Sequence, residues 1–239
     1  MTTQKLQYWV IPPEADEEFV ACMEEVLEVY HRPFDPRNPV VAMDEQPGQL
    51  HKDVRVPIPA IPTQNGHAGH PERPDSEYER NGTVCVFMMV APFLNWRRVS
   101  VRKHRTKLDW AAEIERLVMH DFKDADKVTI IMDNLNVHTR GSFYTKFAPE
   151  YCREILRRCE FIYTPIHGSW LNIAESELSV LTRQCTDRRI GTLEQYRQAV
   201  VAWMNYRNAR AKGVNWQFTT EDARIKLTSV YPSFQFENK

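Results

Sequence analysis

The sequence predicts an α/β protein whose mixed sheet is flanked by helices. Its 239 residues are 42% apolar and 26% charged, which is ordinary for a globular chain with a sizeable core. Apolar patterning indicates the order helix, strand, hairpin, helix, strand, helix, strand and further helices. Antiparallel strands therefore come first and alternating elements later, which is typical of a mixed sheet with helices on its faces.

Composition excludes several classes of protein. No apolar run reaches the roughly 18 residues that a membrane span needs, and the N-terminus lacks the layout of a signal peptide. The net charge of −1 neither nominates nucleic acid as a partner nor excludes it. An odd number of cysteines without a Cys-x-x-Cys pair argues against disulfides and structural zinc. We expect a cytoplasmic protein that does not bind membranes.

The first half of the chain is predicted as a helix, a short strand, a long loop and a hairpin. Residues 15–30 place apolar side chains on one face among acids, which predicts an amphipathic helix. VVAMDE at 40–45 indicates a short buried strand. Residues 46–79 are rich in proline, glycine and charge, which predicts mostly loop, with a short strand near KDVRV. NGTVCVFMMVAPFLNWRRVSVRKH then predicts two strands joined by a turn near residues 91–95.

The second half alternates helices and strands. Its pattern predicts helices over 108–122, 148–158, 169–185 and 192–209, and strands over 127–134 and 159–165. The tail predicts one short helix, with Thr219 or Thr220 as its N-cap.

Two aspartates are predicted to close strands, Asp44 in VVAMDE and Asp133 in VTIIMDN. Ligands of open α/β sheets gather at the carboxyl ends of strands, and carboxylate oxygens suit Mg²⁺. A single strand-ending aspartate is more often the cap of the following turn. Two of them, with a third acid from the segment PIHGSWLNIAESELSVL, favour a metal site.

The third acid is either Glu175 or Glu177 on the helix predicted after residue 168. Leu171, Ala174 and Leu178 form the stripe that should pack on the sheet. The two glutamates border this stripe on opposite edges, roughly 160° apart around the helix. Periodicity allows one of them to join the aspartates and does not say which; the alternative is that both are solvated.

Three segments around these acids resemble one family. MDEQPGQL, IIMDNLNVHT and YTPIHGSWLNIAESELSVL are similar to the catalytic domain of bacterial insertion-sequence transposases of the mariner-like superfamily, specifically the six-thirty insertion-sequence group. The resemblance extends from about residue 8 to the end of the chain. It implies a ribonuclease-H-like fold with a helical C-terminal extension.

The resemblance also implies a catalytic, metal-binding triad of two aspartates and a glutamate. The triad maps to Asp44, Asp133 and Glu175, because Glu175 follows Trp-Leu-Asn at the family's spacing. Glu177 is then a flanking residue or one that supports the site. Four more residues are placed near the site by the same motifs: Asn134, His138, Trp170 and Asn172.

Two of these four carry a more specific expectation. His138 has an orienting or DNA-contacting role if it lies beside the metals, and is otherwise a satisfied loop histidine. Trp170 is expected to pack between the catalytic helix and the sheet.

The implied activity is that of a DNA transposase. Two Mg²⁺ or Mn²⁺ ions would support hydrolysis at transposon ends and joining of the freed 3′-hydroxyl to target DNA. The implied partners are double-stranded DNA, as transposon ends and as target, and a second copy of the chain during synapsis. The alternatives are an inactive or truncated remnant that only binds DNA or partner subunits, and a host nuclease acting on RNA–DNA hybrids.

The resemblance divides the chain into an N-terminal linker and helix at 1–35, the catalytic domain at 36–210 and a tail at 211–239. Full-length members carry a helix-turn-helix region ahead of the catalytic domain. We therefore expect either the second part of a split reading frame or a truncated copy, with the helix-turn-helix as a separate partner. The expected location is the bacterial nucleoid.

Basic residues nominate a DNA contact surface. Arg98 and Arg102 share one face of a predicted strand in NWRRVSVRKHRTKLDW, and Lys103 follows them. Arg183 lies just after the predicted catalytic helix. Their functional interpretation is contact with phosphates, and the alternative is a charged sheet edge that resists aggregation.

Overall fold

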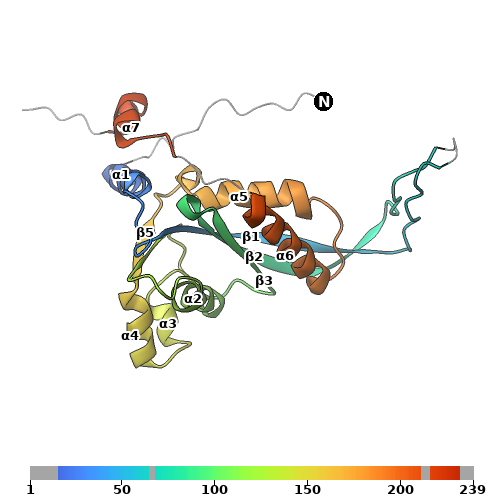
Figure 1. The fold of residues 1–239 in the computed structure, drawn as a ribbon, viewed down its shortest axis with the longest axis horizontal. Helices are drawn as coiled ribbons and strands as arrows, with labels where there is room; N and C mark the ends of the chain where they lie inside the picture. Colours follow the sequence, from blue (N-terminus) through green and yellow to red (C-terminus); the bar gives the residue numbers. More distant parts are fainter. Residues whose placement is uncertain (1–15, 65–67, 211–215, 232–239) are drawn as a thin grey trace, which may run out of the picture.

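A five-stranded mixed sheet forms the centre of the molecule (Figure 1). The computed structural model describes residues 16–64, 68–210 and 216–231. The strand order is β3-β2-β1-β4-β5; β1 runs antiparallel to β2 and parallel to β4. This confirms the predicted fold class. The strands are β1 (Val40–Asp53), β2 (Tyr78–Ala91), β3 (Trp96–Arg102), β4 (Val128–Met132) and β5 (Cys159–Tyr163).

Helices cover both faces of the sheet, and each face has its own core. Alternate residues of β1 separate the two cores: Val40 and Ala42 pack on one side, Val41 and Met43 on the other. The first side carries α1 (Glu17–His31), α5 (Ile173–Leu181), α6 (Leu193–Arg210) and α7 (Thr220–Lys226). The other carries α2 (Lys107–Arg116), α3 (Gly141–Tyr144) and α4 (Pro149–Arg157).

Local signals explain where several helices begin. Asp16 caps α1 by accepting a hydrogen bond from the backbone N–H of Phe19 at 2.9 Å. Thr219, rather than Thr220, caps α7 and forms a reciprocal capping box with Asp222. None of the described helices combines the length and apolarity that a membrane crossing needs.

The helix predicted over 169–185 is divided into three parts. A 3₁₀ turn at Ser169–Leu171 leads into α5, which continues as a π-helical turn at Thr182–Thr186. A similar π-helical turn, Leu117–Asp121, follows α2. The four-residue helix α3 was not predicted, since it is too short to show a periodic pattern.

The prediction that residues 46–79 are mostly loop holds for the described residues between 54 and 77, but the strand that precedes them is longer than predicted. β1 continues to Asp53 and pairs with β2 down to Asp53↔Tyr78. Beyond them, isolated bridges join Ile58 to Arg73 and Ile61 to His70. We call residues 51–64 and 68–80 the arm; it extends away from the body of the molecule (Figure 1).

Pro47 and Gly48 hid this strand, and the structure explains why they are tolerated. Pairing of β1 with β4 ends at Ala42, so at Pro47 the strand has a neighbour on one side only, where a missing donor costs little. At Gly48 a Cβ would lie 2.7 Å from the hydroxyl oxygen of Tyr196. Glycine is needed there because α6 packs closely on the strand.

Candidate active site: three acids at the edge of the parallel strands

Asp44 and Asp133 are neighbours across two parallel strands. The β1–β4 ladder ends at Ala42↔Ile131, and the same register continued by two residues sets Asp44 beside Asp133. Asp44 was predicted to close its strand, but it lies inside β1, which continues to Asp53. What ends there is the pairing with β4, and this leaves the two carboxylates at an open edge.

The start of α5 is tied to this edge. Asn172 caps the helix by accepting a hydrogen bond from Ala174 N–H at 3.1 Å, and its Nδ2 donates to the carbonyl oxygen of Met43 at 2.8 Å. Met43 directly precedes Asp44. Glu175 lies in the first turn of α5 and is exposed. One asparagine therefore fixes the helix that carries the third acid onto the strand that carries the first.

The charges of the three acids act on one another. Burial, together with the negative charges of Asp133, Glu45 and Glu175, raises the pKa of Asp44 to about 7. A hydrogen bond from Glu45 N–H to Asp44 Oδ1, 2.7 Å long, opposes this rise. The carboxylates are thus close enough to repel, as expected of a site that binds a cation.

We predict a signature of this repulsion in metal-free protein. The pKa of Asp44 is higher in the folded state than its unfolded value of 3.8. Its contribution to stability is therefore complete below about pH 4 and is lost as the pH rises through about 7. In chelator, the free energy of unfolding of Asp44→Asn should depend less on pH between 4 and 7 than that of wild type. Parallel curves from denaturant titrations would contradict the placement of Asp44.

His138 joins Asp133 to Glu45 beneath the acids. Its Nε2 lies 2.9 Å from Glu45 Oε1 and its Nδ1 lies 2.8 Å from Asp133 Oδ1. Burial lowers the pKa of His138, but hydrogen bonds to Asp133 and Glu45 outweigh burial and raise it to about 10. The ring stacks on Trp110 with centroids 5.4 Å apart. The imidazole is therefore cationic at neutral pH and wholly buried, so it cannot contact DNA.

Glu45, Asp133 and His138 have ligand atoms within 4.8 Å of one another, the spacing of a metal site. Both ring nitrogens, however, already face carboxylates, and the side chains of Glu45 and His138 have no exposed surface. In this trio the imidazole of His138 bridges the carboxylates of Glu45 and Asp133, so its nitrogens are not free to bind a metal ion. Asp133, whose side chain is 40% exposed, is the member that also reaches the open edge.

Glu177 does not join the acids. Its carboxylate is buried and lies 3.1 Å from Arg97 Nε and 2.8 Å from Arg207 Nη2. Arg97 belongs to β3 and Arg207 to α6, so Glu177 fastens α5 to two other elements. It is neither a solvated residue nor a member of the site, whereas Glu175 points outward at the rim.

Two other residues predicted near the site have different settings. Asn134 is exposed directly after Asp133. Trp170 is half-buried and lies edge-on against Phe218 in the segment before α7, with ring centroids 5.8 Å apart. Trp170 thus links the approach to α5 with the C-terminal segment.

The prediction that Arg98 contacts DNA was wrong. Arg98 is 5% exposed and lies 2.6 Å from Glu113 and 2.7 Å from Asp121. Arg102 shares its face, as predicted, but that face is covered by α2 and Arg102 also pairs with Glu113. Lys103 and Arg183 are exposed.

Glu45 and Trp110 were not predicted as parts of the site. Strand alternation places Glu45 on the opposite face from Asp44, which is the one signal that its role differs. Nothing in the sequence joins Trp110 to His138, since the two lie far apart along the chain and meet only when α2 packs on the sheet.

The fold is that of an α/β protein with a mixed sheet, and two carboxylates lie at the edge of its parallel strands with a third on the helix fixed to that edge, an arrangement of the kind in which hard cations can bind. The chain belongs to the DDE superfamily endonucleases, whose family model matches residues 39–197. This match includes all three acids. The comparison with curated proteins found no match.

Solved structures with the same fold come from Mos1 transposase. The Mos1 strand transfer complex has a TM-score of 0.57 and 14% identity, over 98% of this chain and 68% of that chain. The Mos1 paired-end complex with the left transposon end has a TM-score of 0.54 and 15% identity, over 85% of this chain and 59% of that one. The Mos1 catalytic domain has a TM-score of 0.53 and 12% identity, over 95% of this chain and 100% of that one. At these identities the likeness shows a shared fold.

Proposed function

We propose that the chain is the catalytic domain of a DNA transposase. It would hydrolyse phosphodiester bonds at transposon ends and join the freed ends to target DNA. The observation that carries this proposal is the convergence of Asp44, Asp133 and Glu175, from three distant segments, at one open edge of the sheet. The three motifs that contain these acids support the finer assignment to the six-thirty insertion-sequence group of bacteria.

The donor set fits a hard divalent cation. Three carboxylates offer oxygen ligands, and the raised pKa of Asp44 reflects its burial and then the neighbouring negative charges, which a cation would offset. We assign Mg²⁺ or Mn²⁺ to Asp44, Asp133 and Glu175, with two ions in the active complex. Solved structures of the Mos1 paired-end complex include one with Mg and one with Mn.

The chain's own residues prepare this site. Asn172 holds α5 against β1, which keeps Glu175 at the rim, near enough for its charge to act on Asp44. His138 fixes the direction of one carboxylate oxygen of Asp133, which lies 2.8 Å from its Nδ1. Bound divalent ions would stabilise the negative charge that develops on the attacking and leaving oxygens. Water attacks the phosphorus and the bond to the 3′ oxygen breaks; the freed 3′-hydroxyl then attacks target DNA, so no protein nucleophile is needed.

The same proposal assigns the partners. Double-stranded DNA is the substrate, both as transposon end and as target. The chain spans 59% of the length of the Mos1 chain in the paired-end complex, and we assign recognition of the ends to a separate helix-turn-helix part, as the family resemblance implies.

Nicking of a plasmid that carries the element's ends tests this function. Wild-type protein, with the helix-turn-helix part supplied in trans, should nick the plasmid with Mg²⁺ or Mn²⁺ and stop on addition of chelator. Cleavage of RNA–DNA hybrids in preference to duplex DNA would favour a host nuclease. Failure to nick under every condition would favour the inactive remnant.

A second copy of the chain is the proposed partner in synapsis, and the arm offers a contact for it. Val56, Ile58 and Ile61 are 93%, 56% and 55% exposed, although apolar side chains gain free energy by burial. Val56 lies at the base of the arm and Ile58 and Ile61 lie further along it, and their exposure suits contact with another subunit.

Charges on the arm should therefore prevent dimerisation. We expect wild type to be dimeric at micromolar concentration and Val56→Asp with Ile58→Asp to be monomeric, as measured by light scattering. Val201→Asp, at a 45% exposed apolar position on α6, serves as the control and should leave the mass unchanged. A dimer that persists in the arm variant would exclude the arm from the interface.

A further inference from the structure

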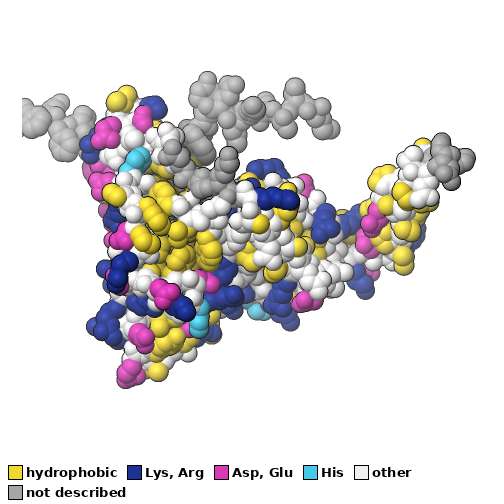
Figure 2. Space-filling view, viewed as in Figure 1, with side chains coloured by type: hydrophobic (Ala, Val, Ile, Leu, Met, Phe, Trp, Pro, Cys, Tyr) yellow, Lys and Arg dark blue, Asp and Glu magenta, His cyan; other side chains and the backbone are white. Residues whose placement is uncertain are grey.

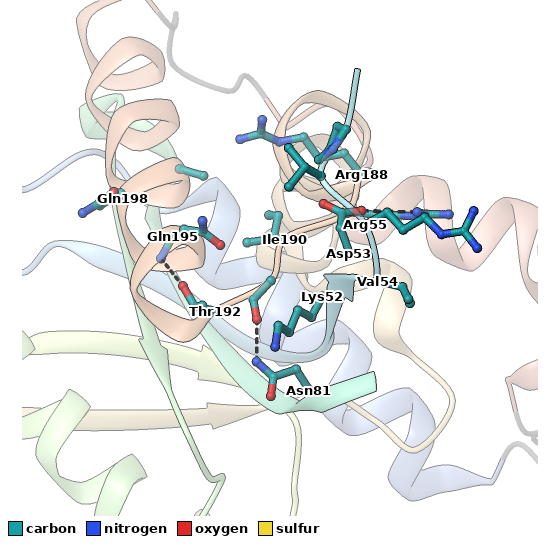
Figure 3. A pocket seen from close by; sticks show the side chains of 15 residues that line it. Lys52, Asp53, Val54, Arg55, Asn81, Arg188, Ile190, Thr192, Gln195 and Gln198 are labelled. Atoms are coloured by element: carbon teal, nitrogen blue, oxygen red, sulfur yellow. Dashed lines mark hydrogen bonds and ion pairs between the residues drawn. The ribbon is translucent and has the colours of Figure 1, made fainter. Parts of the chain in front are cut away.

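A polar hollow lies where the arm leaves the body, away from the three acids (Figure 3). Its volume is about 940 Å³. One wall is the base of the arm and the other is the segment between α5 and α6 together with the start of α6. We call it the basal groove; the residues used below are Lys52, Arg55, Asn81, Arg188, Gln195 and Gln198.

The basal groove is positively charged, and two of its basic side chains form no ion pair among the described residues. Arg55 is paired with Asp75 and Arg189 with Asp53. Lys52 and Arg188 are exposed, and among the described residues no carboxylate forms an ion pair with either. In Figure 2 basic side chains gather where the arm meets the body.

The basal groove also contains neutral side chains that can donate hydrogen bonds. The amides of Asn81, Gln195 and Gln198 lie along its walls. Cations combined with amide N–H groups form the donor set that binds phosphate oxygens of a nucleic-acid backbone. The lining therefore suits a chain of phosphates.

The two walls are fixed to each other. Arg189 donates to the backbone carbonyl oxygens of Ser76 at 3.0 Å and Glu77 at 3.2 Å, and its guanidinium lies over the ring of Tyr78. Asn81 Nδ2 donates to the carbonyl oxygen of Gly191 at 2.7 Å. These contacts cross from the α5–α6 segment to the arm, so the groove is a built feature rather than a gap between two loops.

A second hollow, of about 420 Å³, extends from the basal groove in the direction of the acids. It shares Arg188 with the groove and reaches Gln46 and Thr182, whose side chains are hydrogen-bonded at 3.1 Å. Gln46 lies two residues beyond Asp44 on the same face of β1. Thr182 lies two turns beyond Glu175 on the same face of its helix. The second hollow therefore ends two residues along β1 from Asp44 and two helical turns from Glu175.

The length of this path can be expressed as a number of nucleotides. From Asp44 to Lys52 the extended strand spans about 26 Å, at about 3.3 Å per residue. One strand of DNA advances about 3.4 Å per nucleotide, so the path accommodates about eight nucleotides. A free phosphate or a single nucleotide would occupy only a fraction of it.

We propose that the basal groove binds the phosphate backbone of duplex DNA about eight nucleotides from the phosphate that reacts at the acids. The inference rests on the proposed function, which supplies the DNA. Lys52 and Arg188 anchor the duplex, and the second hollow leads its strand toward Asp44 and Glu175. The groove's part is binding, and the chemistry stays with the acids.

The test is the salt dependence of DNA binding by the full chain. Binding of a fluorescent 30-base-pair duplex is followed by anisotropy in chelator, for wild type and for Lys52→Ala with Arg188→Ala. Each lost phosphate contact lowers the slope of log affinity against log salt by about 0.9. We expect the slope of the double variant to fall by about 1.8, with weaker binding at low salt.

A matched control removes two cations elsewhere. Arg153 and Arg157 are exposed on α4, on the opposite side of the sheet, and their alanine variants should bind as wild type does. An unchanged slope in the groove variant, or an equal loss in the α4 variant, would overturn the proposal. Binding is measured without cleavage, so a protein that binds through the groove but fails to nick would refute only the proposed function.

Discussion

Asp133→Ala is expected to abolish metal-dependent nicking, by about a thousandfold or more. Asp133 contacts both parts of the site, the acids at the open edge and the buried pair of His138 and Glu45. It lies beside Asp44 at the open edge, and its Oδ1 is 2.8 Å from the cationic ring of His138. Its removal takes away one oxygen ligand and one of the two carboxylates that face the imidazole.

The same substitution should act on stability in two opposing ways. Loss of a negative charge relieves the repulsion that raises the pKa of Asp44. However, His138 is then buried with one carboxylate partner, Glu45, in place of two. Asp133→Asn keeps a hydrogen-bond acceptor for Nδ1 and is the variant to compare.

Nicking of supercoiled plasmid checks this prediction, together with thermal unfolding in chelator. We expect both variants to lose nicking and Asp133→Asn to unfold at a higher temperature than Asp133→Ala. Nicking at the wild-type rate by Asp133→Asn, confirmed as folded, would remove Asp133 from the site.

The second large effect separates Glu175 from Glu177, which lie two residues apart on α5. Glu175→Gln should abolish nicking and leave the melting temperature nearly unchanged, because its side chain is exposed at the rim. Glu177→Gln should retain nicking at low temperature but lose stability. It would leave Arg97, which is 3% exposed, without its carboxylate.

The magnitude of the stability loss follows from that burial. Breaking a buried ion pair by removing one partner costs about 3–5 kcal/mol. In a domain of this size each kcal/mol lowers the melting temperature by about 2–4 °C. We expect a fall of roughly 10 °C for Glu177→Gln, measured by circular dichroism. A stable Glu177→Gln that fails to nick, or an active Glu175→Gln, would reverse the assignment of the two acids.

Apolar patterning predicted most of the fold. Both faces of the sheet are buried in a core, so its strands appear in the sequence as continuous apolar runs. The four consecutive apolar residues Val40, Val41, Ala42 and Met43 are enough to predict a strand that is buried on both faces. Its continuation to Asp53 could not be predicted, since Pro47 and Gly48 indicate a turn and are accommodated only by the missing neighbour on one side and by the packing of α6.

The site was predictable at the level of residue types and not of their surroundings. Periodicity left Glu175 and Glu177 as alternatives, and the choice depends on Arg97 and Arg207, which come from other elements. Arg98 was misassigned for the same reason: alternation gives the face of a strand but does not say that α2 covers it.

The basal groove was likewise not predictable from the sequence. Lys52, Asn81 and Arg188 come from three segments that meet only when the arm pairs with itself and docks on the α5–α6 segment. No local spacing connects them.

Iron-directed cleavage can show whether one cation site joins three segments that lie far apart in the sequence. Fe²⁺ in place of Mg²⁺, with ascorbate and peroxide, generates hydroxyl radicals that cut the backbone close to the bound ion. We expect cuts near Asp44, Asp133 and Glu175, and we expect excess Mg²⁺ to suppress them together. Cuts at other positions, such as His70 on the arm, with none near Glu175, would contradict it.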